Sequence, residues 1–292
     1  MAIYERDWKP YSGPLSPPRD RALVLPRYAL RDAFGSRFFF LFFLLCYLPP
    51  LCAAILIYLR HNLTALTALS INPNELVSIN NKFFWFLMGF QNFLAFLVAM
   101  TVGPALVSAD LANNALPLYL SRPLTRAGYL LGKFLPLALL LSAITWMPGL
   151  LLVLLQTSVE GLSWLRDNLR IPVAILLSSG IWIVVLSLMM LAVSAWVKRK
   201  SFARIAVIAY FFTIGAFGGA INLTLGTNLG SMLNLSDAMT VTALDLFGVT
   251  GVQVGAVREN LPLPLALLSL AAIAGLCVLA LTRKIRAYEV VR

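Results

Sequence analysis

The chain has 292 residues, of which 60% are hydrophobic and 12% are charged. Soluble globular proteins carry about 45–50% apolar and about 25% charged residues, so this composition excludes a soluble enzyme, a disordered tail protein and a nucleic-acid-binding module. The charge is unequal, with 23 Lys and Arg against 12 Asp and Glu. In a membrane protein, such an excess of basic residues indicates the topology of the chain more than it indicates a binding partner.

The tail over residues 1–37 precedes the first apolar run and has two parts. Residues 1–20 contain four prolines and a glycine, which predict an irregular, extended segment. Between residues 25 and 38 a helical wheel separates charged from apolar residues, which predicts an amphipathic helix lying in the membrane interface; a polar extension of the first span is the alternative. The charged arc holds Arg27, Arg31 and Asp32, and the apolar arc holds Leu25, Ala29, Leu30, Ala33 and Phe34.

Six segments are long and apolar enough to be membrane helices. A helix needs about 20 predominantly apolar residues to cross the hydrocarbon core, and none of these segments alternates apolar and polar residues as the strands of a membrane barrel do. The sequence therefore predicts an all-α integral membrane protein whose six transmembrane helices form one domain over residues 38–292. The predicted spans are residues 38–59, 83–107, 130–155, 172–197, 202–225 and 262–282.

The Lys and Arg residues between the spans predict the orientation. Eighteen of the 23 lie in the N-terminal tail, in the links 108–133 and 198–204, and in the C-terminal tail, whereas the other three links hold five. The positive-inside rule then places both termini and the two basic links in the cytoplasm. The even number of spans agrees with this, and the basic faces are suited to contact with anionic lipid headgroups.

Prolines and glycines interrupt several spans. Pro50, in a Pro-Pro pair of the first span, and Pro136 and Pro148 in the third predict kinks, at which neighbouring groups must compensate for the lost backbone donors. In the fifth span Gly215 and Gly219 form a Gly-x-x-x-Gly face that allows close approach of another helix. That approach is either within the chain or at a dimer seam.

The outer link over residues 226–261 is long and has its own periodic apolar pattern. We expect it to dip back into the outer leaflet or to cap an exit path; an interfacial helix that anchors the loop is the alternative.

The inner link that follows the second span has the most distinctive sequence. Asp110 is suited to cap a short cytoplasmic helix that ends near Pro117. Leucines on this helix would be exposed, and exposed apolar patches mark protein interfaces; an ordinary basic loop is the alternative. The leucines are Leu116, Leu118 and Leu120, and Arg122 and Arg126 flank them as charge anchors.

The run from Ser108 to Lys133, SADLANNALPLYLSRPLTRAGYLLGK, resembles the type-2 ABC exporter permeases, which are the membrane-embedded subunits of ATP-binding cassette transporters. Members commonly have an acidic residue, a Leu-Tyr-Leu or similar core, Ser-Arg-Pro or Ala-Arg-Pro, a further Arg and Tyr-x-x-Gly-Lys leading into the third span. All of these are present here in the same order. The six spans, the N-terminal amphipathic helix and the cytoplasmic termini are also similar to that family.

The resemblance implies a coupling helix that docks on a separate P-loop ATPase subunit, which would carry ATP and Mg. It further implies a second permease copy or paralogue that completes a dimer, and a location in a bacterial-type cytoplasmic (inner) membrane. The implied contacts with the ATPase are Asp110, Leu116, Leu118, Leu120, Arg122 and Arg126. A smaller contact on the second inner link comprises Lys198, Arg199, Lys200 and Arg204.

The sequence offers no catalytic, cofactor or metal site of its own. The string from Gly128 to Lys133 lacks the spacing and the hydroxyl of a Walker A loop, and His61 has no second histidine with which to share a haem. Lys133 and Arg204 are the charges within the predicted spans, both near the cytoplasmic ends, where we expect them to reach the interface.

Two readings remain for the polar pair Gln91 and Asn92 in the second span. They either hydrogen-bond between helices or line a substrate path at a dimer seam.

The six spans, the basic links and the resemblance together lead us to expect a permease subunit of an ATP-driven exporter. A membrane anchor or scaffold subunit, or an ATP-independent carrier, is the alternative, and the sequence does not indicate the substrate.

Overall fold

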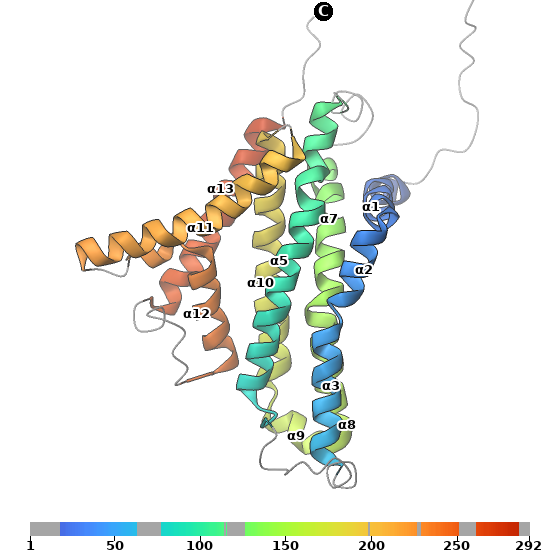
Figure 1. The fold of residues 1–292 in the computed structure, drawn as a ribbon, viewed down its shortest axis with the longest axis vertical. Coiled ribbons are helices and arrows are strands. Elements are labelled where there is room, and N and C mark those ends of the chain that lie inside the picture. The colour runs from blue at the N-terminus through green and yellow to red at the C-terminus, as the bar shows by residue number, and fades with distance from the viewer. Residues whose placement is uncertain are drawn as a thin grey trace, which may run out of the picture.

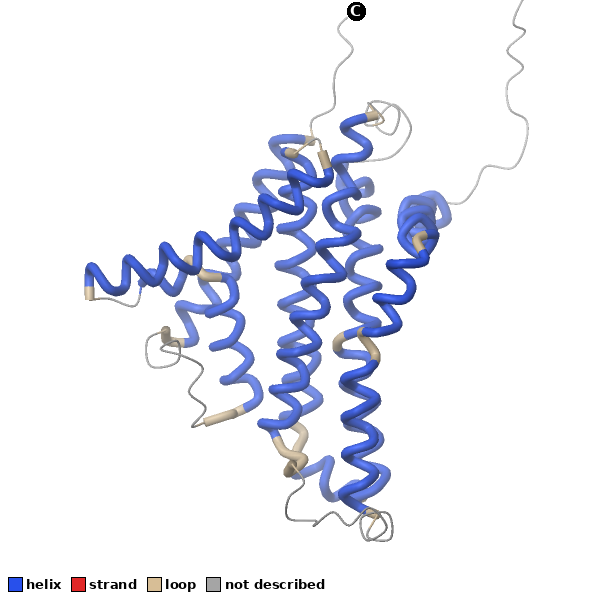
Figure 2. The backbone as a smooth tube through the Cα atoms, in the orientation of Figure 1, coloured by secondary structure: helices blue, strands red, loops and turns tan. Residues whose placement is uncertain are grey.

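The structure is a computed structural model. It describes residues 18–62, 77–113, 115, 126–197, 199–226, 229–250 and 261–285, with side chains from residue 24 onward except that of Leu229. These described parts are helical and contain no strand (Figures 1 and 2). The prediction of an all-α chain is therefore confirmed for them.

Six helical segments are long and apolar enough to cross a membrane, as predicted. Each lies within a few residues of its predicted span, and two of them consist of two helices in line. They are α2 (Arg37–Leu45) with α3 (Leu48–His61), α5 (Asn81–Ala112), α7 (Arg126–Ile144) with α8 (Trp146–Glu160), α10 (Arg170–Trp196), α11 (Lys200–Leu225) and α13 (Leu263–Lys284). The remaining elements are α1 (Pro18–Gly35), α9 (Leu162–Asp167), the 3-10 helix η2 (Leu229–Met232) and α12 (Leu235–Phe247).

Helices α5 and α10 form the centre of the bundle. Of the most apolar stretch of α10, 61% of the residues are buried, against 11% for α11. Gly103 of α5 packs directly on Met190 of α10, so closely that a Cβ at that glycine would overlap the methionine side chain. Figure 1 shows α11 leaning away from this centre, which explains its exposed surface.

The two ends of the bundle differ in which helix termini they carry. At one end, α5, α10 and α13 finish and α7 and α11 begin (Figure 1). We call this the basic end, because it carries Arg126, Arg199, Lys200, Arg283 and Lys284. The opposite end carries α9 and the last turns of α3 and α8. Here His61 Nε2 lies 2.9 Å from Glu160 Oε1, which joins α3 to α8.

Helix α1 lies across the bundle near its basic end, packed against α7 and α2 (Figure 1). It begins at Pro18, within the stretch predicted to be irregular, and it ends at Gly35, because Ser36 caps α2 by accepting a hydrogen bond from the backbone N–H of Phe39 (3.4 Å). Most of the predicted amphipathic pattern is present: Leu25, Ala29, Leu30 and Ala33 pack against the core, whereas Arg27, Arg31 and Asp32 are exposed. Phe34, predicted on the apolar arc, is exposed instead, and the position of α1 in a membrane interface stays a prediction.

The predicted interruptions of the first and third spans are confirmed at two of the prolines. Helix α2 ends at Leu45, shortly before Pro50, and α7 ends at Ile144, shortly before Pro148. Pro136 differs, since α7 continues through it.

The link between α11 and α13 enters the bundle. Helix α12 packs against α10, α13 and α5 and buries Leu235, Met239, Leu244 and Phe247, among others. The described part of the link therefore packs against the spans, and its position relative to the outer leaflet stays a prediction.

The close approach predicted for the fifth span is made by Gly218, which meets Gly230 of η2. A Cβ at Gly218 would overlap the carbonyl oxygen of Gly230 in η2, and Gly215 lies against Asn234, whereas Gly219 faces open space. Asn222 holds the two segments together, because its side chain donates to Ser231 Oγ (2.9 Å) and accepts from the Gly230 N–H (2.7 Å). The approach is therefore made within the chain.

Candidate functional site

A pocket of about 650 Å³ lies between α5, α10, α11 and α12. Aromatic and aliphatic side chains form most of its wall, and the described lining includes no charged side chain. Its polar groups are amides and hydroxyls. The aromatic residues are Trp85, Phe93, Phe96, Trp182, Phe211 and Phe212, and the polar residues are Asn92, Ser178, Asn234, Ser236 and Thr240.

Aromatic contacts connect the helices around this pocket. The rings of Phe96 on α5 and Phe211 on α11 meet edge to face, with centroids 4.6 Å apart. Trp182 of α10 donates its indole N–H to the backbone carbonyl of Asn92 on α5 (3.0 Å). Amphipathic ring systems with a hydrogen-bonding edge suit such walls, so the pocket can hold an uncharged molecule with both apolar and polar faces.

Gln91 and Asn92 are neighbours in the sequence but have different surroundings. Asn92 lines the pocket, and among the described residues its Oδ1 is buried without a hydrogen-bond partner. This oxygen can accept a hydrogen bond from a water molecule or a ligand. Gln91 is fully buried and does not line the pocket.

The Gln91 amide lies where the first and third spans are interrupted. Its Nε2 donates to the carbonyl oxygens of Cys46 (3.2 Å) and Ile144. In a regular helix these two carbonyls would accept from residues 50 and 148, but both positions are proline and have no N–H. Gln91 therefore replaces the two missing donors, which is the compensation that the proline pattern predicted without identifying the residue that provides it.

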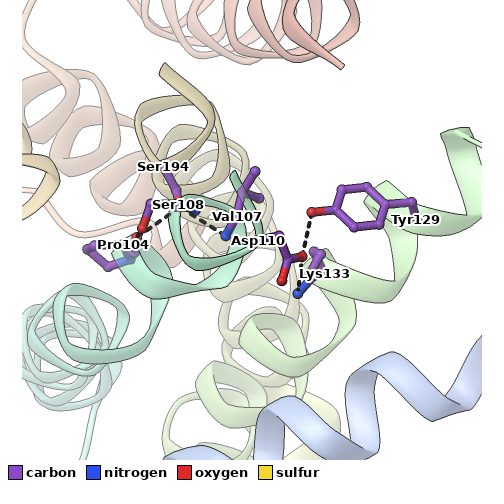
Figure 3. Close-up of polar contacts among 7 residues, drawn as sticks. All are labelled: Pro104, Val107, Ser108, Asp110, Tyr129, Lys133 and Ser194. Carbon is purple, nitrogen blue, oxygen red and sulfur yellow. Dashed lines mark hydrogen bonds and ion pairs between the residues drawn. The ribbon is translucent and has the colours of Figure 1, made fainter. Parts of the chain in front are cut away.

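A buried ion pair lies at the basic end of α5 and α7 (Figure 3). Lys133 Nζ is 2.7 Å from Asp110 Oδ2, and both side chains are about nine-tenths buried. Tyr129 donates its hydroxyl to the same carboxylate oxygen (2.8 Å). The cluster joins the residues that flank the 114–125 segment, because Asp110 lies in the last turn of α5 and Lys133 in the second turn of α7.

Two sequence-based expectations fail at this cluster. Asp110 does not cap a new helix, because α5 continues through it to Ala112. Lys133 does not extend to an interface, because the Asp110 carboxylate lies within reach inside the bundle. Neither side chain could have been paired with the other from sequence spacing alone, since they belong to different helices.

The last turns of α5 are also bonded to α10. Ser194 Oγ accepts from the backbone N–H groups of Val107 (3.0 Å) and Ser108 (2.9 Å) and donates to the carbonyl of Pro104 (2.9 Å), as Figure 3 shows. A side chain of α10 is thus bonded to three backbone groups of α5.

Arg204 connects α11 to the same stretch of α5. Its Nε donates to the Met100 carbonyl (3.2 Å) and its Nη2 donates to the Thr101 carbonyl (3.1 Å). Met100 would otherwise bond to residue 104, which is a proline. Arg204 is therefore bonded to α5 and is half-buried, and its approach to the interface stays a prediction. We call residues 100–112 of α5, with their bonds to α7, α10 and α11, the α5 hub.

Most of the expected docking residues lie outside the described residues, namely Leu116, Leu118, Leu120, Arg122 and Lys198. Of the others, Arg126, Arg199 and Lys200 are exposed at the basic end. The described ranges contain no group of three or more His, Cys, Asp or Glu side chains that could hold a metal ion.

Asp237 on α12 is a titratable residue that the sequence gave no reason to select. Burial raises the pKa of its carboxyl, and a hydrogen bond from the Asn234 side chain lowers that pKa by a smaller amount. It follows Ser236, which lines the pocket.

No known protein family matches this sequence, and no curated protein shows significant similarity to it.

Proposed function

We propose that the chain is the permease subunit of an ATP-driven exporter, in which a separate P-loop ATPase docks on the basic end. The observation that carries the proposal is the α5 hub. The 114–125 segment begins directly after α5, and the hub bonds α5 to α7, α10 and α11. A partner that moves this segment would therefore also move helices that line the pocket.

The pocket supports transport over a purely structural role. A scaffold subunit has no need of a cavity lined by aromatic rings, amides and hydroxyls within its membrane helices, and such mixed linings are typical of small-molecule sites. We infer that the substrate passes through this pocket. The resemblance of the 108–133 region to type-2 exporter permeases supports ATP as the energy source and a second permease copy as the other half of the path.

The test is co-purification with a P-loop ATPase encoded beside this chain. We expect a stoichiometric complex whose ATPase activity depends on the permease. The double substitution Arg122→Glu with Arg126→Glu should weaken the complex at least about tenfold, since reversing charges at an interface removes attraction and adds repulsion. The unfolding temperature of the double variant in detergent should equal that of the wild type.

A matched control reverses two arginines at the opposite end, Arg60→Glu with Arg166→Glu. This variant should bind the ATPase as the wild type does. Equal binding by all three proteins would contradict docking at the basic end, and a failure to bind any P-loop ATPase would favour the anchor or the ATP-independent carrier.

A further inference from the structure

A wide apolar groove runs along α2, α3, α7 and α8, on a different side of the chain from the pocket. Its volume is about 1140 Å³, and its lining includes Pro50 and Pro148, near which the two spans are interrupted. Of its described lining residues, Tyr47 alone has a hydroxyl, and this hydroxyl donates to the Ala143 carbonyl (2.9 Å). We call this the α2–α8 groove.

The groove opens to the surroundings of the chain. Leu41, Leu44, Leu51 and Leu151 line it and are each about 60% exposed. These residues belong to helices apolar enough to cross a membrane, so hydrocarbon is the medium that would fill the groove. A branched or rigid surface would fill an irregular channel less completely than a flexible acyl chain.

A cation stands at one end of the groove. Arg37 is the first residue of α2, and the lining residues Leu41, Leu44 and Leu48 follow it at intervals of four, seven and eleven positions. At 3.6 residues per turn Arg37, Leu41 and Leu44 lie on one stripe of α2, and Leu48 continues the lining as the first residue of α3. Arg37 therefore stands at the head of the groove, beside the lining residue Phe38 and two residues after the end of α1.

We infer that the α2–α8 groove binds an anionic phospholipid, with an acyl chain in the groove and the phosphate at Arg37. An apolar channel that ends at an arginine is complementary to a molecule with a long apolar tail and a negatively charged head. The charge favours a phospholipid over a second copy of the chain, because the leucine stripe of a second copy would leave Arg37 without an anion. This inference does not depend on the ATPase.

The experiment measures lipid retained by the full chain. The protein is reconstituted in vesicles of equal parts phosphatidylglycerol and phosphatidylcholine, extracted in a mild detergent and analysed by native mass spectrometry. We expect retained phosphatidylglycerol in excess of phosphatidylcholine. Arg37→Glu should reduce that excess about fivefold or more, since one basic side chain near an anionic lipid is worth about that factor, and Arg37→Lys should keep most of it.

Two further variants test the groove itself. Leu151→Trp places a large ring in the channel and should displace the lipid, whereas Leu276→Trp, on an exposed position of α13 outside the groove, should not. Arg60→Glu, at the other end of the first span, should retain the wild-type amount. Unfolding temperatures of all variants identify any that fail to fold.

Three results would overturn the inference. They are equal retention of both lipids by the wild type, retention by Arg37→Glu equal to that of Arg60→Glu, and efficient disulfide cross-linking between two chains through Leu151→Cys. The last result would show that a second copy occupies the groove.

Discussion

Gln91 is the residue at which two interrupted helices meet. One side-chain amide donates to the carbonyls that Pro50 and Pro148 leave without partners. In a membrane interior no water is present to bond these carbonyls, so the amide makes two prolines acceptable at the same level of two adjacent spans.

We predict that Gln91→Leu destabilises the chain by about 2–4 kcal/mol, because two buried carbonyls lose their donor. Adding Pro50→Ala and Pro148→Ala should restore much of this loss by returning both backbone N–H groups. Unfolding by a denaturing detergent measures the effect. Asn92→Leu, one residue away, is the control and should cost less, and an equal loss in the two single variants would contradict the assignment.

The buried Asp110–Lys133 pair predicts non-additive effects on stability. Lys133→Met leaves a buried carboxylate without its cation, and we expect a loss of about 3–5 kcal/mol. Combining it with Asp110→Asn should recover most of the loss, because no charge is then stranded. Glu160→Gln breaks the more exposed His61–Glu160 pair and should cost at most about 1 kcal/mol. Additive losses in the double variant would show that the pair is not coupled.

Asp237 predicts a pH dependence of stability. Because burial raises the pKa of its carboxyl in the folded chain, the folded state holds the proton more tightly than the unfolded state does. Stability from this group is therefore greatest below the unfolded-state pKa and decreases as the pH rises to the folded-state pKa. Melting temperatures measured from pH 3 to pH 7 should decrease more for the wild type than for Asp237→Asn. Parallel curves would contradict this.

At the scale of the elements, the spans could be predicted because apolar length is a local property. The interruptions near Pro50 and Pro148 were predictable for the same reason. The groups that compensate for missing backbone donors were not, because Gln91 and Arg204 act on helices distant in sequence. The pairing of Asp110 with Lys133 likewise depends on how α5 packs against α7. The pocket could be anticipated only through Asn92, since its walls come from four separate helices.

The small-residue face of α11 illustrates the same limit. The motif predicted Gly215 and Gly219, but the packing uses Gly218, which meets Gly230 of η2, and Gly215, which lies against Asn234. The glycines can be found in the sequence, but the segment that packs against them, and the side of the helix on which it packs, cannot be predicted from it.

We predict that Gly218→Ala disrupts the packing of η2 on α11 and costs about 1–3 kcal/mol, as overpacking usually does. Gly219→Ala is a matched control on the same helix, where a Cβ meets open space, and it should be neutral or slightly stabilising because alanine favours helix. Thermal unfolding of the two variants side by side measures the difference. A larger effect at Gly219 would indicate that its open face is covered by another chain.

At the scale of the whole molecule, the described structure separates two regions. The basic end carries the α5 hub and exposed cations, and the pocket lies further along α5, between helices that the hub connects. Under the proposed function, a movement at the basic end reaches the pocket through α5 and α11, which meet at Phe96 and Phe211. We propose that ATP turnover on a partner subunit moves these two helices relative to each other.

The most direct measurement is the rate of cross-linking between Phe96→Cys and Phe211→Cys by a short bifunctional thiol reagent. It is made on the complex with the ATPase, after Cys46, Cys52 and Cys277 are replaced by alanine. We predict that ATP with Mg changes the cross-linking rate severalfold compared with a non-hydrolysable nucleotide, and that the completed cross-link stops permease-dependent ATPase activity. Identical rates in both nucleotides, with ATP hydrolysis unaffected by the cross-link, would contradict the account.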